Sequence, residues 1–132
     1  MLVYCDSSAL VKMVVDERES QDLEAWLEQQ GAPQLCSSVI ARTEVVRAVR
    51  RFGEDAVQLA RELLRDVASI DLNNQLADTA ADLDPTVRRS LDALHLAAAV
   101  RVAPSLKAML SYDKRMIEAA RAAGLTVHHP GA

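Results

Sequence analysis

Leu2-Val3-Tyr4-Cys5-Asp6-Ser7-Ser8 is the stretch that decides the fold of this chain. Its first four residues are mostly apolar, with two bulky strand formers in the middle, which is typical of a central parallel strand covered on both faces. Ser7 or Ser8 can cap a helix that starts directly after the strand. In an open α/β sheet, ligands bind beyond the carboxyl ends of the strands. We therefore expect Asp6 to face a functional site.

Length and composition predict one globular domain spanning residues 1–132. Half of the residues are hydrophobic and only 3% are aromatic, so the core must be built from Ala, Leu and Val. No apolar run approaches the roughly 20 residues that a membrane span requires. The first residues lack a basic region and a cleavage site, and we expect a cytoplasmic protein.

The two cysteines and the net charge further limit the kinds of protein that this sequence can encode. Cys5 and Cys36 have no CxxC or Cys/His spacing around them, which predicts two reduced thiols in the core. A net charge of −4 argues against a protein that coats nucleic acid non-specifically. It remains compatible with a nuclease that has an acidic site and a basic rim.

Apolar periodicity and helix stop signals predict strands that alternate with helices. Expected strands cover residues 2–5, 33–36, 68–72, 108–112 and 126–128. Expected helices cover residues 7–15, 20–30, 37–52, 54–67, 74–83, 90–102 and 114–123. Ser37 or Ser38 is expected to cap the third helix and Ser90 the sixth. This alternation predicts an α/β fold with a central, mostly parallel sheet of about four to five strands flanked by helices.

Four acids stand where this architecture would bring them to one edge of the sheet. Asp6 ends the first strand, and Asp113 ends the fourth. Glu44 lies in the second turn of the third helix, and Asp92 lies in the first turn of the sixth. Each has a simpler structural interpretation, since Asp92 suits a helix dipole and Asp113 can be a cap. Glu44 is harder to explain this way, because its helix is largely apolar and its carboxylate needs a partner or a wet cleft.

Four carboxylates at one edge form a candidate cation site. Carboxylate oxygens favour Mg²⁺ or Mn²⁺ over zinc. The implied chemistry is metal-assisted phosphodiester hydrolysis, in which one ion activates a water and a second, about 3.5–4 Å away, stabilises the leaving oxygen. Without metal, mutual repulsion should raise some of the pKa values of these acids.

Neighbouring residues are candidates for supporting roles. Ser7 and Ser8 are most simply caps, yet they could hold a phosphate, and Ser111 could orient Asp113. Arg42 and Arg89 belong to basic segments that could grip a polyanion, although a solvated helix face explains them equally well. Two further side chains, Asp71 and His95, are interpreted as a turn residue and a packed core histidine.

These residues together resemble a PIN domain, and more narrowly the VapC-type toxins of bacterial toxin-antitoxin pairs. The resemblance is carried by Val3 to Leu10, by Glu44, by the segment Arg89 to Ala97 and by Ser111-Tyr112-Asp113. It implies a metal-dependent endoribonuclease that cuts RNA, with Asp6, Glu44, Asp92 and Asp113 as metal ligands. It also implies a homodimer held inactive by an antitoxin. The antitoxin would bind a surface that includes Leu10, Val14, Leu23 and Trp26, though a core role for these residues is equally compatible.

Two other classes remain open at this point. A signalling receiver also has an acidic, Mg²⁺-binding sheet edge, but it needs paired acids after the first strand, where this chain has serines. A catalytically silent domain that only binds RNA or protein has no need of a repulsive acidic cluster. Near the fourth-strand acid, Lys114, Arg115 and Met116 stand where some relatives of the PIN type carry a further carboxylate.

Overall fold

The computed structural model describes all residues, 1–132, and shows a five-stranded parallel sheet. The strands are β1 (Leu2–Cys5), β2 (Gln34–Ser38), β3 (Ala68–Ile70), β4 (Leu106–Leu110) and β5 (Val127–His128). Their order across the sheet is β3-β2-β1-β4-β5, and every neighbouring pair is parallel. The predicted α/β class and parallel sheet are confirmed, with β1 at the centre.

Helices connect these strands. They are α1 (Ser7–Val14), α2 (Ser20–Gln29), α3 (Ala41–Val49), α4 (Glu54–Arg65), α5 (Asn74–Ala81), α6 (Ser90–Arg101) and α7 (Lys114–Ala122). Short 3-10 turns follow α3 at Arg50–Phe52 and α6 at Ala103–Ser105. None of the helices is long and apolar enough to cross a membrane.

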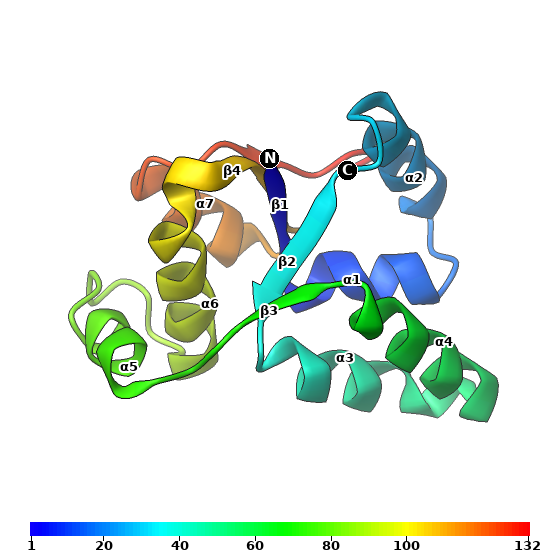
Figure 1. Ribbon diagram of the computed structural model, residues 1–132, viewed down its shortest axis with the longest axis horizontal. Helices are drawn as coiled ribbons and strands as arrows, with labels where there is room; N and C mark the ends of the chain where they lie inside the picture. Colours follow the sequence, from blue (N-terminus) through cyan, green and yellow to red (C-terminus); the bar gives the residue numbers. More distant parts are fainter.

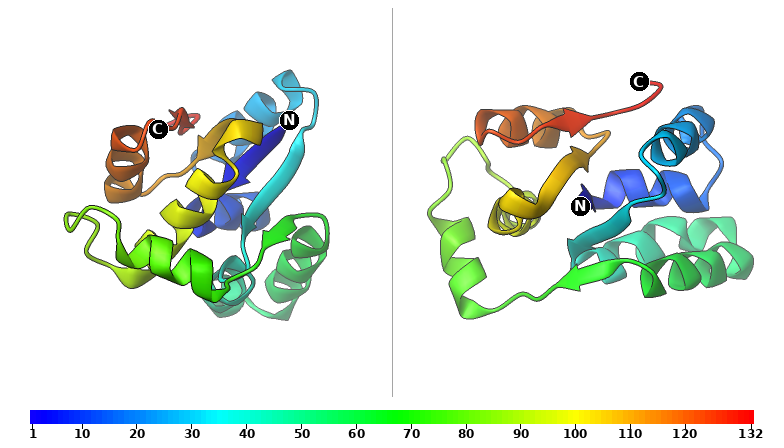
Figure 2. Two further views of the ribbon diagram at one scale, coloured as in Figure 1. Left: turned by 60° about the vertical axis from the view of Figure 1, so that its left-hand side comes forward. Right: turned by 45° about the horizontal axis from the view of Figure 1, so that its top comes forward.

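Two apolar cores cover the two faces of the sheet. Successive side chains of a strand point to opposite faces, so Val3 and Cys5 join the core under α1 to α4, while Tyr4 joins the core under α5 to α7. Figure 1 shows these two helix groups on opposite sides of the strands, and Figure 2 shows the segment after β3 crossing from one side to the other. Both cysteines are buried and unpaired, as predicted.

Several predicted boundaries were wrong, for local reasons. β2 continues through Ser37 and Ser38, which pair with β3, so neither serine caps α3. β4 ends at Leu110, three residues before Asp113. α6 has Arg89 at its N-cap position, and Ser90 is already its first helical residue. In each case the ladder or helix was displaced by a few residues, because serine suits a strand end, a cap and a first turn almost equally well.

Candidate active site

The order of the strands places a topological switch point between β1 and β4. The chain runs outward from β1 to β2 and β3, and then returns to the other side of β1 for β4 and β5. Such a reversal leaves a crevice beyond the carboxyl ends of the two strands that flank it. Asp6 directly follows β1, and Ser111 directly follows β4. The first predicted acid therefore stands, buried, at this switch point of the sheet.

Asp6 is held in place by three donors. Its side chain is 4% exposed, and Oδ1 accepts hydrogen bonds from Ser8 Oγ (2.6 Å) and from the Ala9 backbone N–H (3.1 Å). Oδ2 accepts from Ser111 Oγ at 2.5 Å. Burial raises the pKa of Asp6, and these hydrogen bonds only partly oppose it. Asp6 itself, and neither serine, is the N-cap of α1, because its carboxylate satisfies the free Ala9 N–H.

The serines thus orient acids instead of capping helices. Ser8 also accepts from the Tyr112 backbone N–H at 2.9 Å, which ties the start of α1 to the segment after β4. Ser111 was expected to orient Asp113. It accepts only the Asp113 backbone N–H (3.2 Å), while its hydroxyl proton goes to Asp6. A hydroxyl can donate once and accept twice, so each serine joins Asp6 to the backbone after β4.

Glu44 enters the same region from α3, in the first turn of that helix. Its Oε1 accepts from Ser7 Oγ (2.7 Å) and from His95 Nε2 (2.6 Å). Burial alone would raise the pKa of Glu44, but the hydrogen bonds from His95 and Ser7 outweigh it and lower the pKa. Both bonds end on Oε1, which leaves Oε2 without a protein donor. Sequence reasoning placed Glu44 in the second turn because it started α3 too early.

His95 was correctly predicted to be buried, but its partners were missed. It is 3% exposed, and its ring lies between Glu44 and the Tyr4 hydroxyl, which is 2.7 Å from Nδ1. A buried polar side chain needs hydrogen-bond partners. A histidine one turn after Asp92, within an apolar run, was therefore the sequence signal that a buried polar network exists here. The residues that complete its network are too distant along the chain for periodicity to reveal them.

Asp92 is the acid with the least protein support. It lies in the first turn of α6, half-exposed, and its carboxylate makes no hydrogen bond or ion pair. Burial raises its pKa, and the charges of Asp113 and Glu44 raise it further, while Arg89 and His95 oppose the shift. This coupling shows that acids from α3, α6 and the start of α7 share one electrostatic environment. The predicted repulsion among the acids therefore contributes to the raised pKa of Asp92.

Asp113 is the N-cap of α7, as its simpler interpretation suggested. Its Oδ1 accepts from the Arg115 backbone N–H at 2.9 Å. The second oxygen has no protein donor. Asp113 therefore has a structural role, and its second oxygen, like Glu44 Oε2, has no protein donor.

The four acids fit a hard divalent cation in the kind of donor they supply. All are carboxylates, and the free oxygens of Glu44, Asp92 and Asp113 lack protein donors. In the geometry of the side chains, however, no three His, Cys, Asp or Glu residues form a ready-made metal cluster. Protein hydrogen bonds hold Asp6 and Glu44 in place, and repulsion disfavours closer approach of the others. Coordination of one cation by all four acids would therefore require rotation of side chains, chiefly of Asp92 and Asp113.

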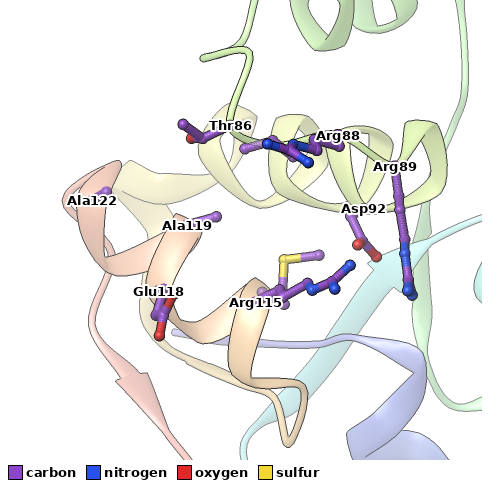
Figure 3. A pocket seen from close by; sticks show the side chains of 10 residues that line it. Thr86, Arg88, Arg89, Asp92, Arg115, Glu118, Ala119 and Ala122 are labelled. Atoms are coloured by element: carbon purple, nitrogen blue, oxygen red, sulfur yellow. The ribbon is translucent and has the colours of Figure 1, made fainter.

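A basic cavity of about 490 Å³ adjoins Asp92. Arg89, at the start of α6, and Arg115, from α7, both extend toward the Asp92 carboxylate in Figure 3. Arg88 lines the same cavity, and the guanidinium groups of these three residues make no hydrogen bond or ion pair with the protein. Its apolar lining consists of Val87, Met116, Ala119 and Ala122. Arg42 is exposed on α3 and does not line this cavity.

Other predicted residues lie elsewhere. Asp71 is exposed after the edge strand β3, in agreement with a turn role. Leu10 is 0% exposed in the core, so it cannot form an accessible partner surface in this conformation, and that assignment is corrected. Leu23 is 1% exposed in the core but lines an apolar cavity between α1, α2 and α4. Val14 and Trp26 are half-buried and remain accessible. The error arose because one apolar stripe on α1 and α2 serves mainly to pack them onto the sheet.

The PIN domain profile matches residues 3–122. The chain belongs to the PIN domain family, in its VapC group. It is similar to the ribonuclease VapC46 of Mycobacterium tuberculosis, with 39% identity over 97% of both chains. It is also similar to the ribonuclease VapC47 of the same species, with 34% identity over 99% of this chain and 98% of the other.

Solved structures of PIN proteins share the fold. M. tuberculosis VapC20, described as a toxin that cleaves the sarcin-ricin loop, has a TM-score of 0.75 at 17% identity and covers 97% of this chain and 99% of its own. VapBC2 from Rickettsia felis, bound to a promoter DNA fragment, has a TM-score of 0.72 at 14% identity, covering 98% and 99%. The resemblance to VapC-type PIN domains drawn from the sequence is thus confirmed.

Proposed function

We propose that this PIN domain is a metal-dependent endoribonuclease that acts as the toxin of a toxin-antitoxin pair. Full-length relatives at 34–39% identity are named ribonucleases. The observation that carries the proposal is the shared electrostatic environment of Glu44, Asp92 and Asp113, next to Asp6 at the sheet reversal. Asp6 and Asp113 also cap helices, but the repulsion of Asp92 by Asp113 and Glu44 is a cost that a bound cation would neutralise.

Asp6, Glu44, Asp92 and Asp113 would hold Mg²⁺ or Mn²⁺. Bound there, the cation supplies a water of lowered pKa for attack on the phosphodiester and charge stabilisation for the leaving oxygen. The chain supplies the orientation. Asp6 is fixed by Ser8, Ala9 and Ser111, and Glu44 is fixed through Oε1, so both carboxylates are positioned before a cation arrives. Asp92 and Asp113 complete the ligand set by rotation.

The cavity beside Asp92 supports RNA as the substrate. Arg89 and Arg115 present unpaired guanidinium groups next to the proposed metal ligands, and such groups form bidentate contacts with phosphate oxygens. The apolar side of the cavity, around Met116 and Ala119, suits the face of a base or ribose. Glu118 also lines the cavity and would disfavour a phosphate at its own end. We place the backbone of the RNA at the end near Asp92.

A cognate VapB-like antitoxin and a second copy of the chain are the proposed partners, in the cytoplasm. Among the proteins that share this fold are VapBC2 and a toxin-antitoxin complex from Klebsiella pneumoniae. An apolar cavity of about 420 Å³ between α1, α2 and α4 gives such a partner a place to bind. Val14 lines this cavity, and Trp26 lies exposed in part on α2.

The alternatives are less consistent with the structure. A receiver domain has the strand order 2-1-3-4-5, whereas this sheet has the order 3-2-1-4-5. A catalytically silent PIN domain would leave the coupled acids without a purpose. The nuclease proposal can be tested by mapping newly formed RNA ends after a brief pulse of expression. Discrete cleavage sites that disappear in Asp6→Asn support the proposal, whereas identical end profiles for both proteins contradict it.

A further inference from the structure

His95 is the centre of a buried hydrogen-bonded chain that joins four segments. The Ser38 backbone N–H, at the end of β2, donates to the Tyr4 hydroxyl at 3.1 Å. Tyr4 Oη lies 2.7 Å from His95 Nδ1, and His95 Nε2 lies 2.6 Å from Glu44 Oε1. Tyr4 is 0% exposed and His95 is 3% exposed, so water cannot replace these partners without opening the core.

The donor and acceptor in each hydrogen bond of this network follow from the groups at its two ends. An ionised Glu44 carboxylate can only accept, so His95 Nε2 must carry a proton and donate it. In the neutral form of the imidazole, Nδ1 is then an acceptor and the Tyr4 hydroxyl donates to it. Burial strongly raises the pKa of Tyr4, which keeps its proton in place. The Ser38 N–H satisfies the phenolic oxygen and thereby fixes the direction in which the hydroxyl points.

The oxygen of Glu44 that accepts these hydrogen bonds indicates that the network does more than pack the core. Ser7 Oγ and His95 Nε2 both bond to Oε1, so two donors on one oxygen fix the rotamer and leave Oε2 unpaired. Ser7 Oγ and His95 Nε2 lie 3.4 Å apart, as two donors to the same carboxylate oxygen do.

We propose that Tyr4 and His95 are positioning residues that hold Glu44 with Oε2 directed to a divalent cation. The inference rests on the proposed function, since the cation is the one assigned there to the four acids. Metal ligands commonly depend on outer partners of this kind, whose loss costs about 10–100-fold in metal affinity or activity. Here the outer partner of a carboxylate is an imidazole, and the imidazole is itself oriented by a buried tyrosine.

The test is the affinity of the RNA-free protein for Mn²⁺, measured by isothermal titration calorimetry. We expect His95→Phe to weaken binding by about 10–100-fold and Tyr4→Phe by about tenfold. His95→Gln keeps an amide donor for Glu44 and should recover part of the loss. Tyr112→Phe is the matched control, because it removes a hydroxyl that bonds only to the Pro130 carbonyl. Its affinity for Mn²⁺ should equal that of the wild type.

Two further readouts separate positioning from general stability. In the RNase assay, the Mn²⁺ concentration for half-maximal cleavage should rise in Tyr4→Phe, while the rate at saturating Mn²⁺ stays near that of the wild type. Nitrogen-15 spectra of the metal-free protein should show the Nε2–H tautomer of His95 and a mixture of tautomers in Tyr4→Phe. Circular dichroism identifies any variant that fails to fold, and His95→Gln, the milder change, then carries the test.

The outcomes are distinguishable. Wild-type affinity in both Tyr4→Phe and His95→Phe overturns the positioning role and leaves the nuclease proposal intact. An Nδ1–H tautomer in the wild-type protein also overturns it, without any use of metal. If the wild-type protein binds no Mn²⁺ but still cleaves RNA, the metal centre and the positioning role fail together. If it binds Mn²⁺ with the predicted losses in the variants but cleaves no RNA, only the proposed function fails.

Discussion

His95 Nε2 lies 2.6 Å from Glu44 Oε1, so one hydrogen bond joins α6 to α3 across the carboxyl end of the sheet. These helices belong to opposite helix layers, and the two residues are 51 positions apart in the chain. Without this bond, Glu44 would be a partly buried carboxylate with Ser7 as its one protein donor. Its low pKa depends on this contact and on Ser7. The site is thus assembled between the layers and is not confined to one strand end.

Asp6→Asn should abolish Mn²⁺-dependent RNA cleavage while leaving the fold intact. Asparagine caps helices as well as aspartate does, so α1 should persist, but the neutral side chain binds a cation poorly. We expect activity to fall by more than about 100-fold, since loss of even an outer partner costs about 10–100-fold. Cleavage of total RNA and far-UV circular dichroism provide the two measurements. Asp71→Asn, an exposed acid after β3, should retain full activity, and retained cleavage in Asp6→Asn would disprove the assignment.

Asp92→Asn should stabilise the metal-free protein at neutral pH. The folded pKa of Asp92 is raised above its ordinary value of 3.8, so ionised Asp92 costs folding free energy at pH values above the raised pKa. Below pH 3.8 the carboxyl is protonated in both states and the cost is absent. The variant should therefore exceed the wild type in melting temperature at pH 7 in EDTA, with the difference vanishing as the pH falls toward 3.8.

Loss of a favourable interaction with the α6 dipole will reduce this gain. Addition of Mn²⁺ should reverse the order, because only the wild type retains the full ligand set and is stabilised by binding. Asp71→Asn serves as the control in the same titration. A wild-type protein that is more stable than Asp92→Asn in EDTA at pH 7 would show that the repulsion among the acids is unimportant.

Arg115→Gln should weaken RNA binding through loss of a phosphate contact. Each phosphate contact to single-stranded nucleic acid contributes a slope of about 0.7 in log affinity against log salt concentration. Binding of a labelled 12-nucleotide poly(U) to the inactive Asp6→Asn protein should therefore show a slope reduced by about 0.7. Arg101→Gln, exposed at the far end of α6, should leave the slope unchanged. Equal slopes for the two arginine variants would remove the cavity from the RNA path.

Leu10→Ala should unfold the protein more easily instead of selectively blocking a partner. Leu10 is fully buried between α1 and the sheet, and such truncations cost about 2–5 kcal/mol. Urea denaturation gives the free energy of unfolding. Val14→Ala, on the same helix but half-buried, should cost less and should have the larger effect on antitoxin binding. The reverse pattern would restore Leu10 to the partner surface.

Expression of the wild-type chain should arrest growth, and co-expression of a small open reading frame next to its gene should relieve the arrest. Asp92→Asn should be harmless at equal protein level, because the arrest depends on RNA cleavage. Growth curves with immunoblots make the comparison. Harmless expression of the wild type, with no antitoxin gene nearby, would exclude the toxin role even if RNA cleavage were found in the purified protein.

The sequence by itself determined the alternation of strands and helices, the parallel sheet and the position of Asp6 directly after the first strand. These features depend on local signals, namely apolar runs and helix stops, together with the rule that ligands lie beyond the strand ends. Only the tertiary structure decided the roles that local signals left open, such as which residue caps a helix and which apolar residue is buried. Asp6 became the cap of α1 because Ser8 and Ser111 were drawn to its carboxylate, and Leu10 became core because α2 to α4 cover α1. Above all, the partnership of Tyr4, His95 and Glu44 exists only because folding removes water from three distant polar groups, which must then satisfy one another.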